Sequence, residues 1–436
     1  MKQYDLGVCK RMVNYKKILN IALPAMMENF LQMLMGTIDS YLVASLGAIA
    51  ISGVSVANNI ITIYQAIFIA LGAIISGAIS KSLGQGEKET LDQKATETVK
   101  LTVFLSVILG TVSFFFGEKI LNILGTERSV SQAGGTFLAL VGGTIILLGL
   151  MTTFGALVRV TRNPRIPMYV SLLVNILNAI FSSFAIFILH WGIIGVALGT
   201  MAARLIGVWL LWKELHLSFE KWTWRIDMDL LRLSLPAAGE RLMMRAGDVV
   251  IIAIVVKFGT NAVAGNAIGE VLTQFNYMPA FGVATATVML VAHAMGQKNI
   301  KEISQISRQT YWISLALMLP IALLIFAFGR PLTQLSRLND EGIAASLSVI
   351  LFSLLGTPMT VGTVIYTAVW QGMGNAKLPF YATTVGMWMI RIIVGYILGV
   401  TLQLGLSGVW TATLLDNGFR WIFLQILYKR KIRRLE

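Results

Sequence analysis

The stretch PAMMENFLQMLMGTIDSYLV, residues 24–43, is apolar over most of its length and yet carries Glu28, Gln32 and Asp39. At 100° per residue these side chains lie within about 60° of one another, so a helix here would present one polar stripe. A carboxylate at the centre of a bilayer costs roughly 2.5 to 3.5 kcal/mol. The stripe must therefore face protein or water, and its carboxylates need a basic partner, a bound cation or a proton.

The composition is that of a polytopic membrane protein. Of 436 residues, 56% are hydrophobic and 13% are charged, and apolar runs of the roughly 20 residues that cross a bilayer recur along the whole chain. The single cysteine, Cys9, excludes an internal disulfide, and no Cys and His cluster offers metal ligands. We expect no cofactor and no metal, and the three widely separated histidines argue against an enzyme.

Twelve stretches are predicted to cross the membrane. Several exceed the roughly 20 residues needed for a span, so we expect tilt, or helix that continues beyond the bilayer. The predicted spans are residues 18–43, 50–80, 97–117, 134–158, 166–190, 192–212, 231–256, 262–295, 309–328, 345–370, 379–402 and 405–428.

Basic residues are distributed unequally between the two sides of the membrane. Segments on the side of the N-terminus hold 25 Lys and Arg, and the opposite side holds five. Basic residues near span ends stay in the cytoplasm, so both termini are predicted to be cytoplasmic, in the cytoplasmic (inner) membrane. The net charge of +14 is spread over short loops, with no basic domain to bind nucleic acid.

The chain contains an internal repeat with a constant offset of 212 residues. The offset carries Leu23-Pro24 onto Leu235-Pro236, and it holds without a gap over much of each half. Near the end of each half it slips by one residue. Further pairs under the offset are Glu28 with Glu240, Gly47 with Gly259, Gly84-Gln85 with Gly296-Gln297, Asn163 with Asn375, Pro167 with Pro379 and Tyr169 with Tyr381.

This repeat predicts two six-helix bundles, residues 1–212 and 231–436, joined by a cytoplasmic linker at residues 213–230. Because six spans return the chain to the same side, the repeat is parallel and its pseudo-two-fold axis is normal to the membrane. The expected fold is an all-α integral membrane protein with twelve transmembrane helices. A cleft between two such bundles suits alternating access, and we expect a monomer in contact with membrane lipid.

The first half supplies oxygen atoms that could surround Asp39. Asn175, Asn178 and Ser182 follow i, i+3, i+7 spacing and share one helical face, and Thr200 lies in the next span. Together with Asp39 these oxygens could hold a hard cation, or could hydrogen-bond a protonated carboxyl. A buried polar network that only fixes helix packing is the alternative.

Other charges fall near span ends or beside opposite charges. Glu28 and Glu240 follow the repeated prolines and are predicted to be gating or capping residues. Arg245 and Asp248 share a helical face and are predicted to pair, with a structural or gating role. Asp416 and Arg420 are predicted to form a second local pair.

Glu270 has no basic neighbour in sequence, and Asn266 and Gln274 flank it at i−4 and i+4. Its repeat partner is Asn58, so both halves carry a polar group at this depth. Glu270, Gln274, Asn58 and Gln32 are predicted to line the cleft, where a carboxylate would attract a cationic substrate or carry a proton. The alternative for Glu270 is an ion pair with Arg204, Arg391 or Arg420.

Several motifs, in this order and spacing, resemble the multidrug and toxic compound extrusion (MATE) family. They are ALPAMMENF with Asp39 fifteen residues after Pro24, the LGQG and MGQK turns, the R-x-x-x-N-x-x-x-P stretch at 159–167 with its partner QGMGNAKLP, and NILNA at 175–179. The resemblance covers essentially the whole chain. It implies a proton- or sodium-coupled antiporter that exports amphipathic, often cationic, small molecules.

The resemblance also implies a cation site formed by Asp39, Asn178 and Thr200 in the N-terminal half. Family members with a full site carry an acidic residue where this chain has Ser182, and this departure favours protons over sodium. The competing function is a flippase for lipid-linked oligosaccharides from the same superfamily, which would be expected to have a more basic cleft.

Overall fold

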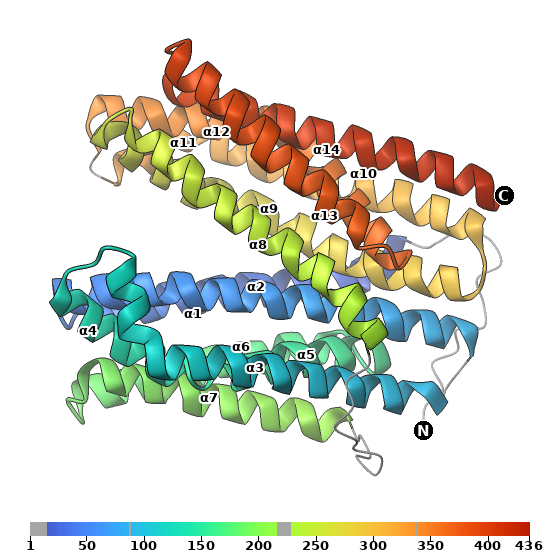
Figure 1. Cartoon of the computed structure of the whole chain (residues 1–436), viewed down its shortest axis with the longest axis horizontal. Coiled ribbons are helices and arrows are strands. Elements are labelled where there is room, and N and C mark those ends of the chain that lie inside the picture. Colours follow the sequence, from blue (N-terminus) through green and yellow to red (C-terminus); the bar gives the residue numbers. More distant parts are fainter. Residues whose placement is uncertain (1–14, 87–88, 216–227, 337) are drawn as a thin grey trace. The chain divides into compact units, whose positions relative to one another are not determined.

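The computed structural model describes residues 15–86, 89–215, 228–336 and 338–436, and all regular structure in these ranges is helical (Figure 1). The predicted all-α membrane fold is confirmed. The linker predicted at 213–230 lies mostly outside the described residues. The helices are α1 (Tyr15–Ala44), α2 (Ala48–Gln85), α3 (Glu89–Ile123), α4 (Arg128–Phe137), η1 (Leu138–Gly142), α5 (Ile145–Thr161), α6 (Arg165–Phe187), α7 (Gly192–Leu215), α8 (Met228–Val256), α9 (Thr260–Gly296), α10 (Ile300–Ala327), α11 (Gly329–Gln334), α12 (Asp340–Gly372), α13 (Lys377–Thr384), η2 (Val385–Val394), η3 (Ile397–Thr401) and α14 (Gly405–Leu435).

In the described ranges, the long helical runs coincide with the predicted spans. The run α4, η1 and α5 forms one span with a 44° bend, and α13, η2 and η3 form another. Nine described helices are long and apolar enough to cross a membrane, or ten with the bent pair. The charged residues within α8 and α14 make these two helices too polar to be counted among the nine, although each occupies a predicted span.

Two helices begin well before their predicted spans. α3 begins at Glu89 and α10 at Ile300, whereas the apolar stretches begin at residues 97 and 309. The start of α10 is set by Asn299, whose side chain accepts from the backbone N–H of Glu302. An N-cap residue that is followed three residues later by Glu stabilises the first turn, so the helix can begin in the polar segment before its apolar stretch.

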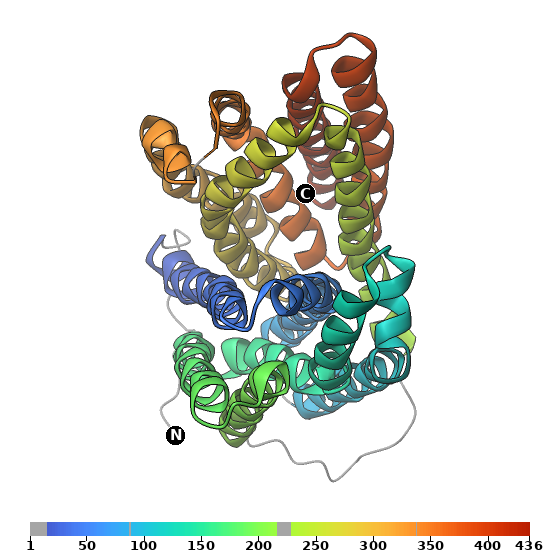
Figure 2. The same ribbon diagram turned by 90° about the vertical axis from the view of Figure 1, so that its left-hand side faces the viewer.

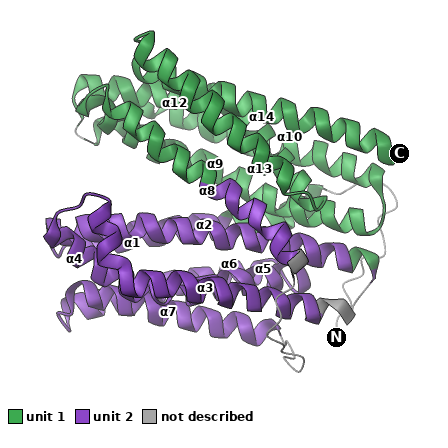
Figure 3. Ribbon diagram, viewed as in Figure 1, with its two compact units in different colours: residues 1–26, 83–85, 243–436 green, residues 27–82, 86–242 purple. Residues whose placement is uncertain are grey.

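The chain divides into two compact units, which Figure 3 shows in different colours. Unit 1 contains residues 15–26, 83–85 and the described part of 243–436, and unit 2 contains residues 27–82 and the described part of 86–242. The division falls within α1 and α8. The first turns of α1 therefore belong to the core of unit 1, where Ile18 and Ala22 are fully buried.

The turns of the two halves repeat the same backbone conformation. Gly47 and Gly259, which are repeat partners, have φ of 104° and 94°, a region that only glycine adopts readily. Three further pairs share positive φ: Gly86 with Lys298, His190 with Gln403, and Gly192 with Gly405. The first of these pairs keeps the offset of 212, and the last two have an offset of 213. The slip seen in the sequence is thus present in the folded chain.

Small residues allow close approach of helices within unit 2. A Cβ placed on Gly53 of α2 would lie 2.6 Å from the backbone N of Gly134 and 2.8 Å from the carbonyl O of Val130. Because lipid provides no hydrophobic drive for helix association, such backbone contacts are a main source of packing energy in membranes.

Replacing Gly53 with Ala is therefore expected to destabilise the protein by about 1 to 3 kcal/mol, since backbone atoms must move. The matched control is Gly36→Ala in α1, where an added Cβ meets nothing within 4 Å. The control should be neutral or slightly stabilising, because Ala favours a helix over Gly by about 1 kcal/mol. Thermal unfolding in detergent measures both, and equal melting temperatures would contradict the close contact.

Candidate functional site

The polar residues of α6 and α7 lie where these two helices pack side by side (Figure 1, Figure 2). A Cβ on Gly199 of α7 would lie 2.8 Å from the backbone N of Ser182 on α6. Asn178 Nδ2 donates to Thr200 Oγ1 at 2.9 Å, and Thr200 Oγ1 donates to the Val196 carbonyl at 2.9 Å. The structure thus brings together side chains that the sequence places on one face.

Asp39 of α1 belongs to the same cluster. It is 6% exposed, and Asn178 hydrogen-bonds its carboxylate. The Asn178 amide therefore connects Asp39 to Thr200. Three helices of unit 2 contribute to this site, and we refer to Asp39, Asn175, Asn178, Ser182 and Thr200 as the Asp39 cluster. Its role as a cation site stays a prediction.

The Asp39 cluster contains buried oxygen atoms without hydrogen-bond partners. Among the described residues, these include Asp39 Oδ1, Asn175 Oδ1, Asn178 Oδ1 and Ser182 Oγ. A buried acceptor without a donor costs about 1 to 3 kcal/mol. Carboxylate, amide and hydroxyl oxygens are the ligands that hard cations prefer, and a proton on Asp39 would supply a donor. The donor set therefore fits a proton or a small cation.

Arg204 is a basic neighbour of Asp39 that sequence reasoning assigned elsewhere. It lies one helical turn after Thr200 on α7 and interacts electrostatically with Asp39. In the described part of the chain, the ion pairs within 4.0 Å do not include Asp39. From the sequence, Arg204 was one of three possible partners for Glu270, and within unit 2 the structure shows that it interacts with Asp39. Its charge can balance an ionised Asp39 without locking it.

The remaining polar residues of α1 have other neighbours. Gln32 Oε1 accepts from Gln65 Nε2 of α2 at 2.9 Å. Asn58, also on α2, is half-buried. Gln32 therefore ties α1 to α2, and the assignment of Gln32 and Asn58 to a cleft stays a prediction.

Glu28 pairs with Arg159 of α5, and the two side chains are 12% and 11% exposed. Glu28 and its repeat partner Glu240 are both buried and lie in the interior of α1 and α8. The capping role is therefore wrong for both, because neither is at a helix end. For Glu28 a buried ion pair that holds α1 against α5 replaces it.

In unit 1, Asp248 has two basic neighbours. Arg391 Nη1 lies 3.5 Å from Asp248 Oδ1, and Arg245 Nη1 lies 3.9 Å from Asp248 Oδ2. The predicted pair of Arg245 and Asp248 is therefore present, but the shorter contact goes to Arg391 of η2. The predicted pair of Asp416 and Arg420 is confirmed, with a separation of 2.7 Å.

Glu270 is exposed on α9 and accepts from Asn266 Nδ2 at 3.1 Å. Asn266 Oδ1 in turn accepts from the indole N–H of Trp410 at 2.9 Å. Of the partners that the sequence offered for Glu270, Arg391 is electrostatically close. Gln274, one turn later, is exposed on the same helix. Glu270 is thus accessible at the surface of its unit while it is anchored to a buried amide.

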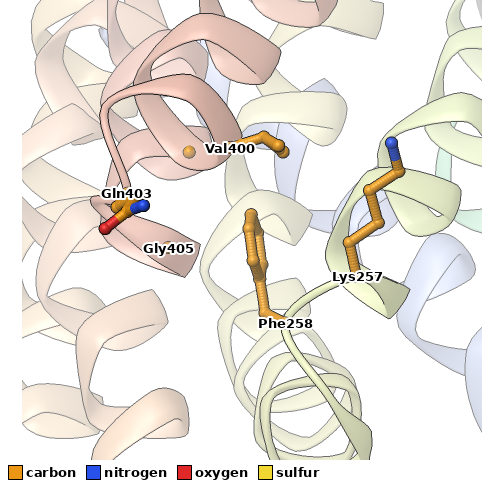
Figure 4. A pocket seen from close by; sticks show the side chains of 6 residues that line it. Lys257, Phe258, Val400, Gln403 and Gly405 are labelled. Carbon is orange, nitrogen blue, oxygen red and sulfur yellow. The ribbon is translucent and has the colours of Figure 1, made fainter.

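A small cavity of about 250 Å³ opens at the turns that follow α8 and η3 in unit 1 (Figure 4). The Lys257 ammonium lies 4.8 Å from the centre of the Tyr396 ring, a cation–π contact. The cavity is lined by Lys257, Phe258, Gly399, Val400, Gln403 and Gly405. None of the residues predicted for the site lines it, so this cavity is distinct from the Asp39 cluster.

The sequence did not predict that Arg159 pairs with Glu28 or that Arg391 contacts Asp248. Arg159 was considered as part of the motif at 159–167, and Arg391 as one of three possible partners for Glu270. A signal existed for Arg204, since it follows Thr200 at i+4 and so shares its helical face.

Comparison with known proteins agrees with this architecture. The sequence profile of the MatE family matches residues 24–184 and 236–397, one segment in each half of the chain. By fold and by sequence this is a multi-pass membrane transporter. The chain belongs to the MatE family, the multidrug efflux transporters that its motifs resemble.

Two curated relatives cover nearly the whole chain. The "Probable multidrug resistance protein NorM" of Thermotoga maritima is 27% identical over 419 residues, which are 93% of this chain and 90% of that protein. The "Uncharacterized transporter YisQ" of Bacillus subtilis is 24% identical over 430 residues, with 95% and 94% covered. Among solved structures, "Crystal structure of MATE in the bent conformation" has a TM-score of 0.89 at 19% identity and covers 96% of each chain.

The pair of Glu28 and Arg159 gives a testable consequence for stability. Arg159→Met leaves a buried carboxylate without its partner and is expected to cost about 3 to 5 kcal/mol. Removing both charges, with Glu28→Gln and Arg159→Met together, should recover most of this loss. Arg165→Met, which removes an exposed basic residue nearby, should change stability by less than about 0.5 kcal/mol. Thermal unfolding measures all three, and an unchanged melting temperature for Arg159→Met would refute the buried pair.

Proposed function

We propose that this chain is a cation-coupled antiporter that exports amphipathic, mainly cationic, small molecules by alternating access, with protons as the coupling ion in preference to sodium. Membership of the MatE family and the relative named as a multidrug resistance protein support efflux of small molecules. The proposal places the chain in the cytoplasmic membrane with both termini in the cytoplasm.

The environment of Asp39 supports its role in coupling. It is a buried carboxylate within an apolar span, and one of its oxygens lacks a hydrogen-bond partner. Arg204 interacts with it electrostatically, and the ion pairs within 4.0 Å among the described residues do not include Asp39. A carboxylate in this setting can exist ionised, balanced by Arg204, or neutralised by an incoming cation. Two states of similar free energy are what an exchanging site requires.

Protonation of Asp39 from outside removes its attraction to Arg204 and weakens the hydrogen bond from Asn178. The contact between α1 and the hairpin of α6 and α7 then changes, and α1, which contains Pro24, re-packs. In the proposed cycle this change releases substrate outward. Loss of the proton to the cytoplasm restores the first arrangement.

The driving force depends on the charge of the substrate. For a neutral substrate, one proton charge that crosses 100 mV yields about 2.3 kcal/mol, and each tenfold substrate gradient costs about 1.4 kcal/mol. When one proton exchanges for one monovalent cation, no net charge crosses the membrane, and each tenfold proton gradient balances a tenfold substrate gradient. Protons are favoured over sodium because the Asp39 cluster has one carboxylate, with Ser182 where a second acid would strengthen sodium binding.

Asp39→Asn is expected to abolish gradient-driven efflux of a fluorescent cation from proteoliposomes, because the amide cannot exchange a proton. Proton and sodium gradients are imposed separately to identify the coupling ion. Asp340→Asn, the same change at an exposed acid in the first turn of α12, is the matched control and should retain wild-type transport. Retained gradient-driven transport in Asp39→Asn would remove Asp39 from coupling. Movement of labelled lipid instead of the dye would favour the flippase.

Glu270→Gln tests the assignment of Glu270 to substrate binding. A charge contact at about 4 Å in a wet site contributes roughly 1 kcal/mol, so the KM for a cationic substrate should rise about fivefold. The KM for a neutral amphipathic substrate should not change. Equal effects on both substrates would show that Glu270 acts through packing.

A further inference from the structure

The second half of the chain contains a counterpart of the hydrogen-bonded pair in the Asp39 cluster. Arg391 Nε donates to Thr413 Oγ1 at 3.1 Å, and Thr413 Oγ1 donates to the Val409 carbonyl at 3.2 Å. In the first half, Asn178 donates to Thr200 at 2.9 Å, and Thr200 donates to the Val196 carbonyl at 2.9 Å. An offset of 213 carries all three residues of the first half onto those of the second. Arg391 thus replaces the amide of Asn178.

The π-helical segment η2 accounts for the offset of 213. Pro167 and Pro379 still match at 212, whereas Gly192 and Gly405 match at 213, so one residue has been inserted between these points. A π-helical turn accommodates one extra residue, and η2 spans Val385–Val394. Arg391 lies in this segment, and the extra residue brings it into register with Thr413.

The charges around Arg391 include two carboxylates. Asp248 of α8 lies 3.5 Å from its guanidinium, and Glu270 of α9 is electrostatically close. Among the described residues, Arg245 of α8 and Tyr277 of α9 also interact with this cluster. On α14, Asp416 is paired with Arg420. The Arg391 side chain is 15% exposed, while that of Asp248 is 37% exposed. The permanent cation is therefore more deeply placed than the acid that it contacts.

An arginine differs from an exchangeable ion in two respects. The guanidinium does not lose its proton in proteins, and its covalent link prevents it from leaving the site. Its charge favours the ionised form of nearby carboxylates whatever the pH and the cation concentration. In the first half, the corresponding residue is the neutral Asn178, so part of the negative charge of Asp39 must be balanced by another group.

We propose that Arg391, at the place corresponding to Asn178 of the Asp39 cluster, is a built-in cation of the second half that keeps Asp248 and Glu270 ionised, so that these acids do not exchange ions. The inference rests on the proposed function, because it takes the Asp39 cluster to be the site at which ions exchange. It assigns Arg391 a positioning and specificity-determining role: this residue restricts ion exchange to one half of the transporter.

The test is labelling by a hydrophobic carbodiimide, which reacts with protonated carboxyl groups, followed by peptide mass spectrometry. In the wild type, Asp248 and Glu270 should stay unlabelled from mildly acidic to mildly alkaline pH. In Arg391→Gln, labelling of one or both should rise at least about tenfold and should increase as pH falls, because an uncompensated carboxylate takes up a proton. Arg391→Lys, which keeps the charge, should behave as the wild type.

Unchanged labelling in Arg391→Gln, or equal labelling in Arg391→Lys and Arg391→Gln, would overturn the proposal. Asp416 is an internal control, since its pairing with Arg420 should keep it unlabelled while the protein is folded. Should Arg391→Gln unfold, the double variant Asp248→Asn with Arg391→Gln removes the pair together, and Glu270 must then become labelled. An unlabelled Glu270 in that variant refutes the proposal.

The same samples separate this inference from the proposed function. Labelling of Asp39 and transport by Asp39→Asn report on the first half alone. If Asp39→Asn transports normally, coupling by Asp39 is refuted, while labelling at Asp248 and Glu270 still decides whether Arg391 holds those acids ionised.

Discussion

A charge within an apolar span must be compensated, and this constraint organises the polar interior of the protein. Glu28 is matched by Arg159, and Asp416 by Arg420, each within its own unit. Such pairs are internally balanced and can remain fixed through a cycle. Asp39 is treated differently, because an amide and a more distant arginine share its compensation. Because these two groups compensate the charge of Asp39 only in part, the carboxylate can still bind a proton or a cation, and the Asp39 cluster is therefore suitable for exchange.

Much of the fold follows from the sequence. Apolar run length and the repeat of Gly, Pro and Asn define twelve spans, and the helical runs follow them, because a backbone in lipid must satisfy its own hydrogen bonds. The trio of Asp39, Asn178 and Thr200 was also predictable, since the family resemblance implies it and helical spacing places Asn178 on a polar face.

Other features depend on contacts that spacing does not encode. The helices α3 and α10 begin before their apolar stretches, and at α10 the N-cap residue Asn299 rather than hydropathy sets the boundary. The partners of Glu28 and Asp248 lie more than a hundred residues away along the chain, on helices whose rotation depends on packing. The sequence offered Arg391 as a possible partner for Glu270, but it did not indicate that Arg159 pairs with Glu28 or that Arg391 contacts Asp248.

The π-helical segment η2 changes how the two halves should be compared. In a regular α-helix one inserted residue would rotate everything after it by about 100° about the helix axis, whereas the π-helical turn absorbs the residue and shifts only the numbering. A gapless comparison at 212 would pair Asn178 with Ile390 and would report a loss of polarity in the second half. The match by hydrogen bonding is with Arg391, which means that the position of Asn178 kept its polarity and gained a charge in the second half. Evolutionary comparisons of the halves therefore need structural equivalence, because linear numbering would conceal the most informative substitution.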